Sequence, residues 1–505
     1  MPGFVAGYSY LLLTQTVSRL LPFVVNTLVA RRLTPEEFGV PTVHFQLLST
    51  IILTCREGFR RALMRDTGTG DGKSDTTEES QEAAGWLVVP IGAVLSAGVP
   101  YAVYFLGGLS WGDPYAQAVA LYGFSAFLEL LAEPFYIRAQ RRSYYRLRLA
   151  AETVATLSRS FVTFYFVSSP GMSASVPLAF AFGQMAYGVC ILMFYAIAQL
   201  DFAKVGVRVL VGQGNMRRGT LALIGTFSCQ AIWKLLLAEG EKGVLLWVGS
   251  ADAQGVYALV SSLGSLFVRI ILQPFEEAAF VMFARNQSTA KPTTIKRLRS
   301  EETNMLSMLL KVAWMLGLLA AVHGPQFSQL ALRLLYGKRW ADAEGAAAAL
   351  GGFAVMVLFL AVNGITEAFA HAVMSPPELA SANLVLLISS VLNVVASVIL
   401  QRRFGALGLM IANCCTMSIR ICYTMRFIFV RLQGVEYLKR SLPDKRVLLV
   451  WAATSGLVTF TSMASSHFIH LGSGVMCGGL AVGSIVMFER PLIREVLGLK
   501  HTKGA

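Results

Sequence analysis

Residues 353–373 read FAVMVLFLAVNGITEAFAHAV, an apolar stretch interrupted by a few polar side chains, Asn363 and Glu367 among them. A helix needs about 20 predominantly apolar residues to cross a hydrocarbon core of roughly 30 Å. This stretch has that length, and blocks of the same kind recur along the chain, for example at 8–30 and 448–463. We therefore expect an all-α integral membrane protein.

The composition of the chain supports a lipid environment. The 505 residues are 55% hydrophobic and 14% charged, whereas soluble proteins carry roughly 25% charged residues. The net charge of +14 would suggest nucleic-acid binding in a soluble protein, but here the basic residues flank the apolar blocks, as in the positive-inside pattern. We expect the lipid bilayer as a partner and no nucleic acid. The first block, 8–30, has the length of a span that is retained and not of a cleaved leader.

Several kinds of site are not expected. The seven cysteines lie within apolar blocks and lack the CxxC spacing of zinc sites, so we interpret them as small apolar residues and not as disulfides or metal ligands. The chain has no GxxxxGK[ST] phosphate loop, which argues against nucleotide binding and ATP hydrolysis. We expect no cofactor, no metal and no enzymatic activity.

Division of the apolar blocks at Gly, Pro and charged clusters predicts about 14 transmembrane helices. Their cores are expected near 8–30, 39–58, 84–109, 115–137, 149–168, 176–199, 219–239, 254–284, 304–322, 348–373, 379–400, 406–425, 447–465 and 471–489. An even number of spans places both termini on one side, and the loops of that side hold most of the 43 Lys and Arg residues. Both termini are therefore predicted to be cytosolic. The glycosylation sequon at Asn286 then falls in a cytosolic loop, 285–303, where it would not be used.

The two halves of the chain resemble each other. Gln15 and Arg19 in the first span recur as Gln230 and Lys234 in the seventh. We expect two pseudo-symmetric lobes of about six helices each, with a substrate site between them. The expected boundaries are 1–200 for the N-terminal lobe, 201–218 for a cytosolic linker, 219–431 for the C-terminal lobe, 432–489 for two extra helices and 490–505 for a cytosolic tail.

Several segments spread over the chain carry a resemblance to one eukaryotic family. They are REGFRRAL (56–63), ELLAEPFYIRAQ (129–140), LLAEGEKGVL (236–245), GVYALVSSLGSLFVRIILQPFEEA (255–278), AVNGITEAFAHAVMS (361–375) and LGLMIANCCTMSIR (407–420). With these segments the chain resembles the dolichol-linked oligosaccharide translocation proteins of the multidrug/oligosaccharidyl-lipid/polysaccharide (MOP) exporter superfamily. The long segment 255–278 is the most specific of them.

The resemblance implies a V-shaped transporter fold with a central cavity, in the endoplasmic reticulum membrane. It also implies a substrate, the oligomannose intermediate on dolichyl pyrophosphate, moved from the cytosolic to the lumenal leaflet for protein N-glycosylation. Other membrane proteins of that pathway become candidate partners. Two alternatives stay open: a non-transporting accessory subunit of the same pathway, and a drug or ion exporter of the same superfamily.

Arg19 is the first candidate for binding the headgroup. Gln15, Arg19 and Asn26 fall on one face of the first span and form a polar stripe along an apolar helix. A guanidinium donates two parallel charge-assisted hydrogen bonds to a phosphate, which a lysine cannot do. The alternative is that Arg19 is neutralised by a carboxylate such as Glu57 or Glu133.

Arg56, Arg60, Lys234 and Arg269 are further candidates for substrate binding. An isolated cation within a span costs about 2.5–3.5 kcal/mol on insertion scales, so these side chains are expected to face a hydrated cavity. The alternative for Lys234 and Arg269 is an ion pair with a neighbouring helix, and for the arginines of the second span it is pairing along the same helix with Glu57.

The second and eighth spans carry matching sequences of opposite charge, FRRA at 59–62 and FEEA at 275–278. We hypothesise that the two clusters pair across the cytosolic mouth of the cleft and close it as the lobes rock. The residues of this gate are Arg60, Arg61, Glu276 and Glu277, and Glu57 is a further ion-pair candidate beside them. The alternative is that each cluster is neutralised within its own lobe, by Glu57 or by Arg269.

Two intramembrane carboxylates are candidates for coupling to an ion or a proton. Glu133 precedes Pro134, and Glu367 lies one helical turn from both Asn363 and His371. The structural alternatives are that Glu133 bonds backbone groups freed by Pro134, and that Asn363, Glu367 and His371 form a buried polar cluster.

Overall fold

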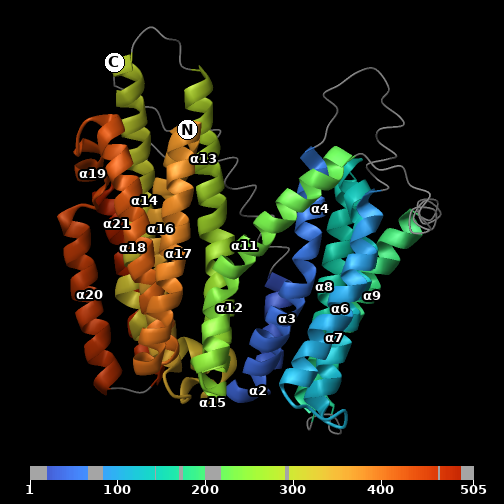
Figure 1. The fold of residues 1–505 in the computed structure, drawn as a ribbon. Coiled ribbons are helices and arrows are strands. Elements are labelled where there is room, and N and C mark those ends of the chain that lie inside the picture. The colour runs from blue at the N-terminus through green and yellow to red at the C-terminus, as the bar shows by residue number, and fades with distance from the viewer. Residues whose placement is uncertain are drawn as a thin grey trace. The chain divides into compact units, whose positions relative to one another are not determined.

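The described part of the chain is built of helices (Figure 1). The computed structural model describes residues 20–65, 84–142, 144–169, 175–199, 218–289, 295–464 and 467–490. Within these ranges, 8 helices are long and apolar enough to cross a membrane, or up to 10 if each bent pair of helices is one span. The predicted all-α fold with multiple apolar spans is therefore confirmed, whereas the count of about 14 spans stays a prediction.

The helices cluster into two compact units. The N-terminal unit is Leu21–Leu246, and the C-terminal unit includes the chain from Trp247 onward. The helices up to the boundary are Leu20–Ala30, α2 (Pro35–Gly39), η1 (Val40–His44), α3 (Phe45–Leu53), α4 (Cys55–Arg65), η2 (Gly85–Leu87), α6 (Val88–Leu106), α7 (Pro114–Arg141), α8 (Tyr145–Ser168), α9 (Val176–Ala198) and α11 (Arg218–Val248). Those that follow are α12 (Ala251–Phe267), η4 (Val268–Leu272), α13 (Gln273–Thr289), α14 (Ile295–Tyr336), α15 (Lys338–Ala341), α16 (Ala346–Val373), α17 (Pro376–Phe404), α18 (Ala406–Leu432), α19 (Glu436–Ser441), α20 (Lys445–Ala464) and α21 (His467–Phe488).

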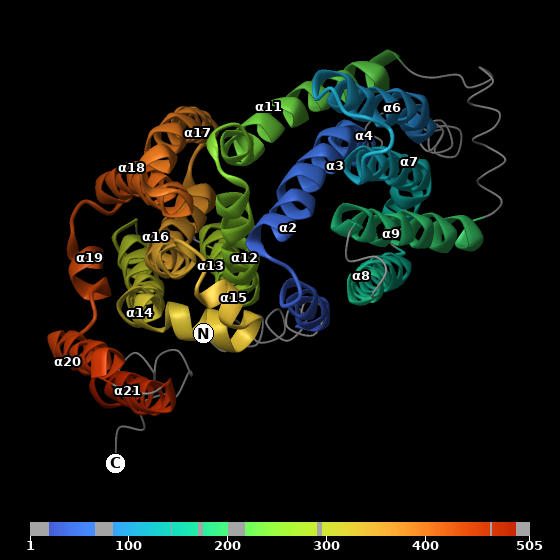
Figure 2. The same cartoon turned by 90° about the horizontal axis from the view of Figure 1, so that it is seen from below.

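α7 is the central helix of the N-terminal unit. In its most apolar window 67% of the residues are buried, against 39% for α9. Seen end on, the helices follow the order α6, α7, α9, α8 (Figure 2), and neighbours in this order pack against each other. Glycines allow this approach: a Cβ at Gly123 would lie 2.6 Å from Ser96 O of α6, and one at Gly188 would lie 2.9 Å from Ser125 O of α7. The centre of α7 is thereby shielded from lipid.

α16 has the same role in the C-terminal unit. In its most apolar window 56% of the residues are buried, against 11% for α17. α16 packs against α12, α13, α14 and α18 (Figure 2). α20 and α21 pack as a pair against α14, where Lys311 Nζ lies 3.1 Å from Glu489 Oε2. Trp451 Nε1 of α20 donates to Ala481 O of α21 at 3.1 Å.

The second expected span, 39–58, is not one straight helix, which corrects the prediction. The chain passes through the π-helical segment η1, which contains Pro41, and α3 and α4 then meet at Thr54 with a bend of 43°. Pro41 lacks an N–H and so removes one helical hydrogen bond. Thr54 Oγ1 donates to Thr50 O at 2.7 Å, a bond that often bends a helix. The length of an apolar run does not reveal such breaks.

Several helices extend beyond their expected spans. α13 continues to Thr289 and includes Asn286, and α14 begins at Ile295, so much of the loop expected at 285–303 is helical. α14 also exceeds its expected core, 304–322. The reason is that helical hydrogen bonds join backbone groups four residues apart whether the side chains are apolar or charged. The apolar criterion detects only the part of a helix that suits lipid.

Candidate functional site

The N-terminal unit carries a polar face on its central helix. Glu129, Glu133, Tyr136 and Gln140 follow one another at intervals of about one helical turn and so share one face of α7. We call these residues the α7 polar face. The side chains of Glu129 and Glu133 are 5% and 2% exposed. Two carboxylates are thus buried in the centre of an apolar unit.

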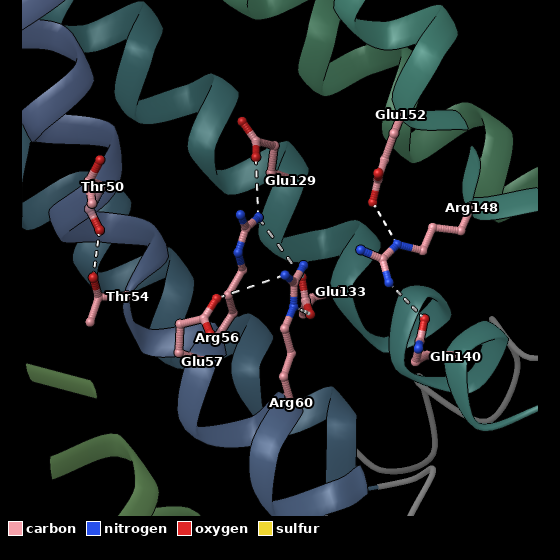
Figure 3. A network of polar contacts seen from close by, with 10 residues as sticks. All are labelled: Thr50, Thr54, Arg56, Glu57, Arg60, Glu129, Glu133, Gln140, Arg148 and Glu152. Atoms are coloured by element: carbon pink, nitrogen blue, oxygen red, sulfur yellow. Dashed lines mark hydrogen bonds and ion pairs between the residues drawn. The ribbon is translucent and has the colours of Figure 1, made fainter. Parts of the chain in front are cut away.

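Two guanidinium groups of α4 meet these carboxylates (Figure 3). Arg60 Nη2 donates to Glu133 Oε2 at 2.8 Å, and Arg60 Nε donates to Glu133 Oε1, so the contact is bidentate. Arg56 Nη1 lies 3.3 Å from Glu129 Oε2 and 4.0 Å from Glu133 Oε2. Arg56 and Arg60 are one turn apart on α4, and Glu129 and Glu133 are one turn apart on α7. Each arginine therefore contacts the glutamate that lies opposite it on α7.

This pairing removes a large energetic penalty. Four unpaired charges within hydrocarbon would cost on the order of 10 kcal/mol on insertion scales. That is comparable with the whole stability of a typical fold, about 5–15 kcal/mol. The side chains of Arg56 and Arg60 are both 22% exposed. A ligand can therefore reach the cations while the carboxylates behind them stay buried.

The polar face extends toward a third basic side chain, Arg148. Two guanidinium groups lie over the ring of Tyr136, with Arg60 Cζ at 4.0 Å and Arg148 Cζ at 5.3 Å from its centroid. Such contacts stabilise a cation by the ring quadrupole. Arg148 also lies 2.9 Å from Glu152 Oε1 and donates to Gln140 Oε1 at 3.1 Å (Figure 3). α8 is thereby joined to the same face.

At the end of the face where Glu129 lies, the side-chain amide of Gln184 is a further hydrogen-bond partner. Gln184 of α9 is buried, and its Nε2 donates to Glu129 Oε1 at 2.9 Å. Its Oε1 accepts from Arg159 Nη1 of α8 at 3.4 Å. The contacts of the α7 polar face thus connect α4, α7, α8 and α9.

The C-terminal unit holds a second carboxylate and guanidinium pair. Arg420 of α18 donates to Glu367 Oε1 of α16 from Nη2 at 2.6 Å and from Nε at 2.9 Å. One turn along, Thr424 Oγ1 donates to Thr366 Oγ1 at 3.1 Å. A cavity of about 10 Å³, lined in part by His371, borders the pair. This is room for about one water molecule.

Glu276 of α13 lies beside this pair. A Cβ at Gly364 of α16 would be 1.9 Å from Glu276 Oε1, so the carboxylate rests on this glycine. Glu276 interacts electrostatically with Glu367 of α16 and with Arg420 of α18. Arg269, the alternative partner expected for it, is an exposed side chain of η4. Glu367 therefore contacts the Arg420 guanidinium, and Glu276 lies near enough to interact with the same charge.

The predicted substrate-binding residues have different surroundings. Arg56 and Arg60 lie in the ion pairs described above. Three others are exposed side chains of their own units: Asn26, Lys234 and Arg269. Gln15 and Arg19 lie outside the described residues, so the role of Arg19 stays a prediction.

The predicted gate residues have contacts within their own units. Glu57 Oε1 lies 3.8 Å from Arg60 Nη1, as expected for one helical turn, and Arg61 is half-buried. Glu277 Oε1 accepts from Gln273 Nε2 at 3.1 Å. A pair between the arginine and glutamate clusters would join the two units, and it stays a prediction.

The two carboxylates proposed for coupling have partners other than those expected. Within the part of the chain that the structure describes, Glu133 binds Arg60 and no hydrogen bond joins it to backbone groups near Pro134, and α7 continues through this proline. Among the hydrogen bonds of the described residues, none joins Glu367 to Asn363 or His371. The partner of each carboxylate is an arginine of another helix.

Sequence reasoning did not single out several residues of these sites, Glu129, Arg420 and Gln184 among them. Glu129 had a signal, because it precedes Glu133 by one helical turn in ELLAEPFYIRAQ. Arg420 was visible as a cation inside an apolar block that needed a partner. Gln184 had no signal, since an isolated amide in an apolar helix is not informative by itself.

The fold is similar to that of known membrane transporters. The lipid II flippase MurJ, in an inward closed conformation, aligns with a TM-score of 0.66 at 11% identity and covers 96% of this chain and 100% of its own. An inward-facing multidrug resistance MATE family transporter of the MOP superfamily aligns with a TM-score of 0.60 at 13% identity, over 85% of this chain and 99% of its own. At such identities the likeness concerns the fold.

Relatives of known name align over most of the chain. The Man(5)GlcNAc(2)-PP-dolichol translocation protein RFT1 of Dictyostelium discoideum is 29% identical over 522 residues, which cover 93% of this chain and 92% of the relative. The protein of the same name from Mus musculus is 30% identical over 521 residues, which cover 95% of this chain and 94% of the mouse protein. The Rft-1 family model, described as Rft protein, matches residues 4–499, a range that includes every helix of the α7 polar face. Because the match extends over nearly the whole chain, this protein belongs to the Rft protein family.

Proposed function

We propose that this protein moves Man(5)GlcNAc(2)-PP-dolichol from the cytosolic to the lumenal leaflet of the endoplasmic reticulum membrane, for protein N-glycosylation. The observation that carries the proposal is the alignment with relatives named as translocation proteins for this lipid. The mouse protein aligns over 95% of this chain and the Schizosaccharomyces pombe protein over 88%. The fold shared with a lipid II flippase supports a lipid-transport role.

A protein path is needed because of the headgroup. Each sugar hydroxyl costs roughly 4–8 kcal/mol to move unpaired from water into hydrocarbon, and the pyrophosphate charges cost more. A path for this headgroup must supply hydrogen-bond partners and cations at the depth of the membrane. The α7 polar face and the arginines of α4 supply both within an otherwise apolar unit.

In this proposal Arg56 and Arg60 bind the pyrophosphate. Each arginine side chain is 22% exposed, and its guanidinium contacts a buried carboxylate. A phosphate approaching from the exposed side finds a cation that is already oriented and partly neutralised, so it binds reversibly instead of being trapped. Reversible binding suits a carrier, which must also release its cargo.

The proposal includes an arrangement of the whole chain. We place both termini in the cytosol and assign about 14 spans to two lobes of about six helices each. The lobes are 1–200 and 219–431, followed by two extra helices in 432–489. The positive-inside distribution of Lys and Arg supports this topology.

Reconstitution of the purified full chain in lipid vesicles tests the function. Vesicles carry Man(5)GlcNAc(2)-PP-dolichol, and a mannose-binding lectin added outside captures the glycolipid of the outer leaflet. We expect capture to exceed half of the glycolipid when the protein is present and to remain near half in empty vesicles. A variant with Arg56→Gln and Arg60→Gln should behave as empty vesicles.

Unchanged capture in the presence of well-folded wild-type protein would contradict the proposal. If the same protein still restores N-glycosylation in depleted cells, the accessory role is favoured instead. Movement of a phospholipid without the glycan at the same rate would indicate unspecific lipid exchange.

A further inference from the structure

Arg159 differs from the cations that pair with carboxylates in the helices described above. Arg60, Lys311 and Arg420 each lie within ion-pair distance of a carboxylate. Arg159 is half-buried in α8, and none of the ion pairs found among the described residues includes it. Its contacts are the neutral oxygen of Gln184 at 3.4 Å and the ring of Tyr187, whose centroid is 5.7 Å from Arg159 Cζ.

The position of Gln184 beside Arg159 is tightly determined. α8 and α9 approach closely at the preceding residue, since a Cβ at Gly183 would lie 2.0 Å from Thr163 Oγ1 and 3.0 Å from Arg159 O. The backbone oxygen of Gln184 accepts from Ser125 Oγ at 2.6 Å. These contacts join Gln184 to both neighbouring helices.

The orientation of the Gln184 amide follows from its partners. Glu129, as a carboxylate, can only accept hydrogen bonds, so the Gln184 nitrogen must face it. The Gln184 oxygen is then directed at Arg159. The guanidinium is thereby oriented by a neutral group, while Glu129 interacts with it only from beyond ion-pair distance.

A guanidinium has five N–H donors, and Gln184 accepts from one of them in the described structure. The nearby Arg56 Nε is buried and has no hydrogen-bond partner among the described residues. The three arginines Arg56, Arg60 and Arg159 are matched by three carboxylates, Glu57, Glu129 and Glu133. What distinguishes the region is its unused N–H donors, on Arg159 and on Arg56, which are the complement of an anion.

We propose that Arg159, oriented by Gln184, forms an anion subsite that binds a phosphate of a lipid-linked pyrophosphate. The identity of the ligand rests on the proposed function, whereas the subsite itself rests on the geometry of α8 and α9. An anion at this position neutralises the charge of Arg159, which no carboxylate of the described residues approaches within ion-pair distance. A sugar or a neutral lipid would not do so.

Binding to the full chain in lipid nanodiscs tests the subsite. The probes are dolichyl pyrophosphate, inorganic pyrophosphate and uncharged dolichol. We expect Arg159→Gln to weaken binding of dolichyl pyrophosphate about 10- to 100-fold, the effect of losing a charge-assisted hydrogen bond. The affinity of Arg159→Lys for dolichyl pyrophosphate should lie between that of Arg159→Gln and that of wild type. Arg32→Gln is the matched control, because Arg32 is an exposed arginine that also lies over a ring of α8, that of Phe164.

The outcomes separate the subsite from the function. Wild-type affinity of Arg159→Gln for dolichyl pyrophosphate would overturn the subsite and leave the proposed function intact. No binding of dolichyl pyrophosphate to wild type would overturn both. Loss of dolichol binding together with pyrophosphate binding would show that Arg159 maintains the fold, which also overturns the subsite. An effect on inorganic pyrophosphate alone would exclude the lipid as its ligand.

Discussion

Glu133→Gln is expected to destabilise the N-terminal unit strongly. The substitution keeps the shape of the side chain but removes the charge that Arg60 contacts through two hydrogen bonds. Breaking a buried pair by removing one partner costs about 3–5 kcal/mol, because the other charge stays behind. Arg60 keeps 22% of its side chain exposed and has a second carboxylate, Glu57, at 3.8 Å. We therefore expect a value of about 3 kcal/mol, at the lower end of that range.

The double variant Arg60→Met with Glu133→Met should regain this stability. Replacing both members of a buried pair by apolar residues of similar volume is often neutral or stabilising by about 1–4 kcal/mol. In a membrane-spanning unit the apolar pair also avoids the penalty for intramembrane charge. The double variant should nevertheless fail to transport, because the guanidinium that binds the headgroup is absent.

Thermal unfolding of the full chain in detergent, followed by tryptophan fluorescence, measures these effects. Trp86 is 5% exposed and packs against Phe135 of α7 with ring centroids 5.3 Å apart, so it reports on this helix. For a unit of this size, about 3 kcal/mol corresponds to a decrease in Tm of roughly 6–12 °C. A Tm of Glu133→Gln equal to wild type, or a double variant no more stable than the single one, would refute the reasoning.

Three further predictions concern packing, the second ion pair and topology. Gly58→Ala should lower stability by about 1–3 kcal/mol, because its Cβ would lie 2.7 Å from a backbone nitrogen of α11. Gly225→Ala is the control, because a Cβ at Gly225 meets open space. Equal Tm values of the two variants would contradict this prediction. Glu367→Gln should cost about 1–3 kcal/mol through loss of the charge that Arg420 contacts, and a Tm equal to wild type would argue against a stabilising pair. Asn286 should remain unglycosylated in cells, and a shift in mass on glycosidase treatment would place it in the lumen.

The sequence by itself determined where the helices lie and which solvent surrounds them. The block expected at 84–109 corresponds to the helical run Gly85–Leu106, and 176–199 corresponds to Val176–Ala198. The reason is physical: the length and apolarity of a segment are local properties, and they decide whether that segment is stable as a helix in hydrocarbon. The breaks at η1 and Thr54 were missed because they depend on single backbone hydrogen bonds.

The sequence also showed that the charges within spans require compensation, since an isolated one is costly. It did not show which groups provide it. The internal repeat aligned Arg60 with Glu276, whereas in the C-terminal unit the arginine that binds the central helix comes from α18. Arg60 and Glu133 are 73 residues apart in the chain, and Glu367 and Arg420 are 53 apart. Only the packing of whole helices brings such groups within hydrogen-bond distance, so the tertiary structure alone decided the pairs.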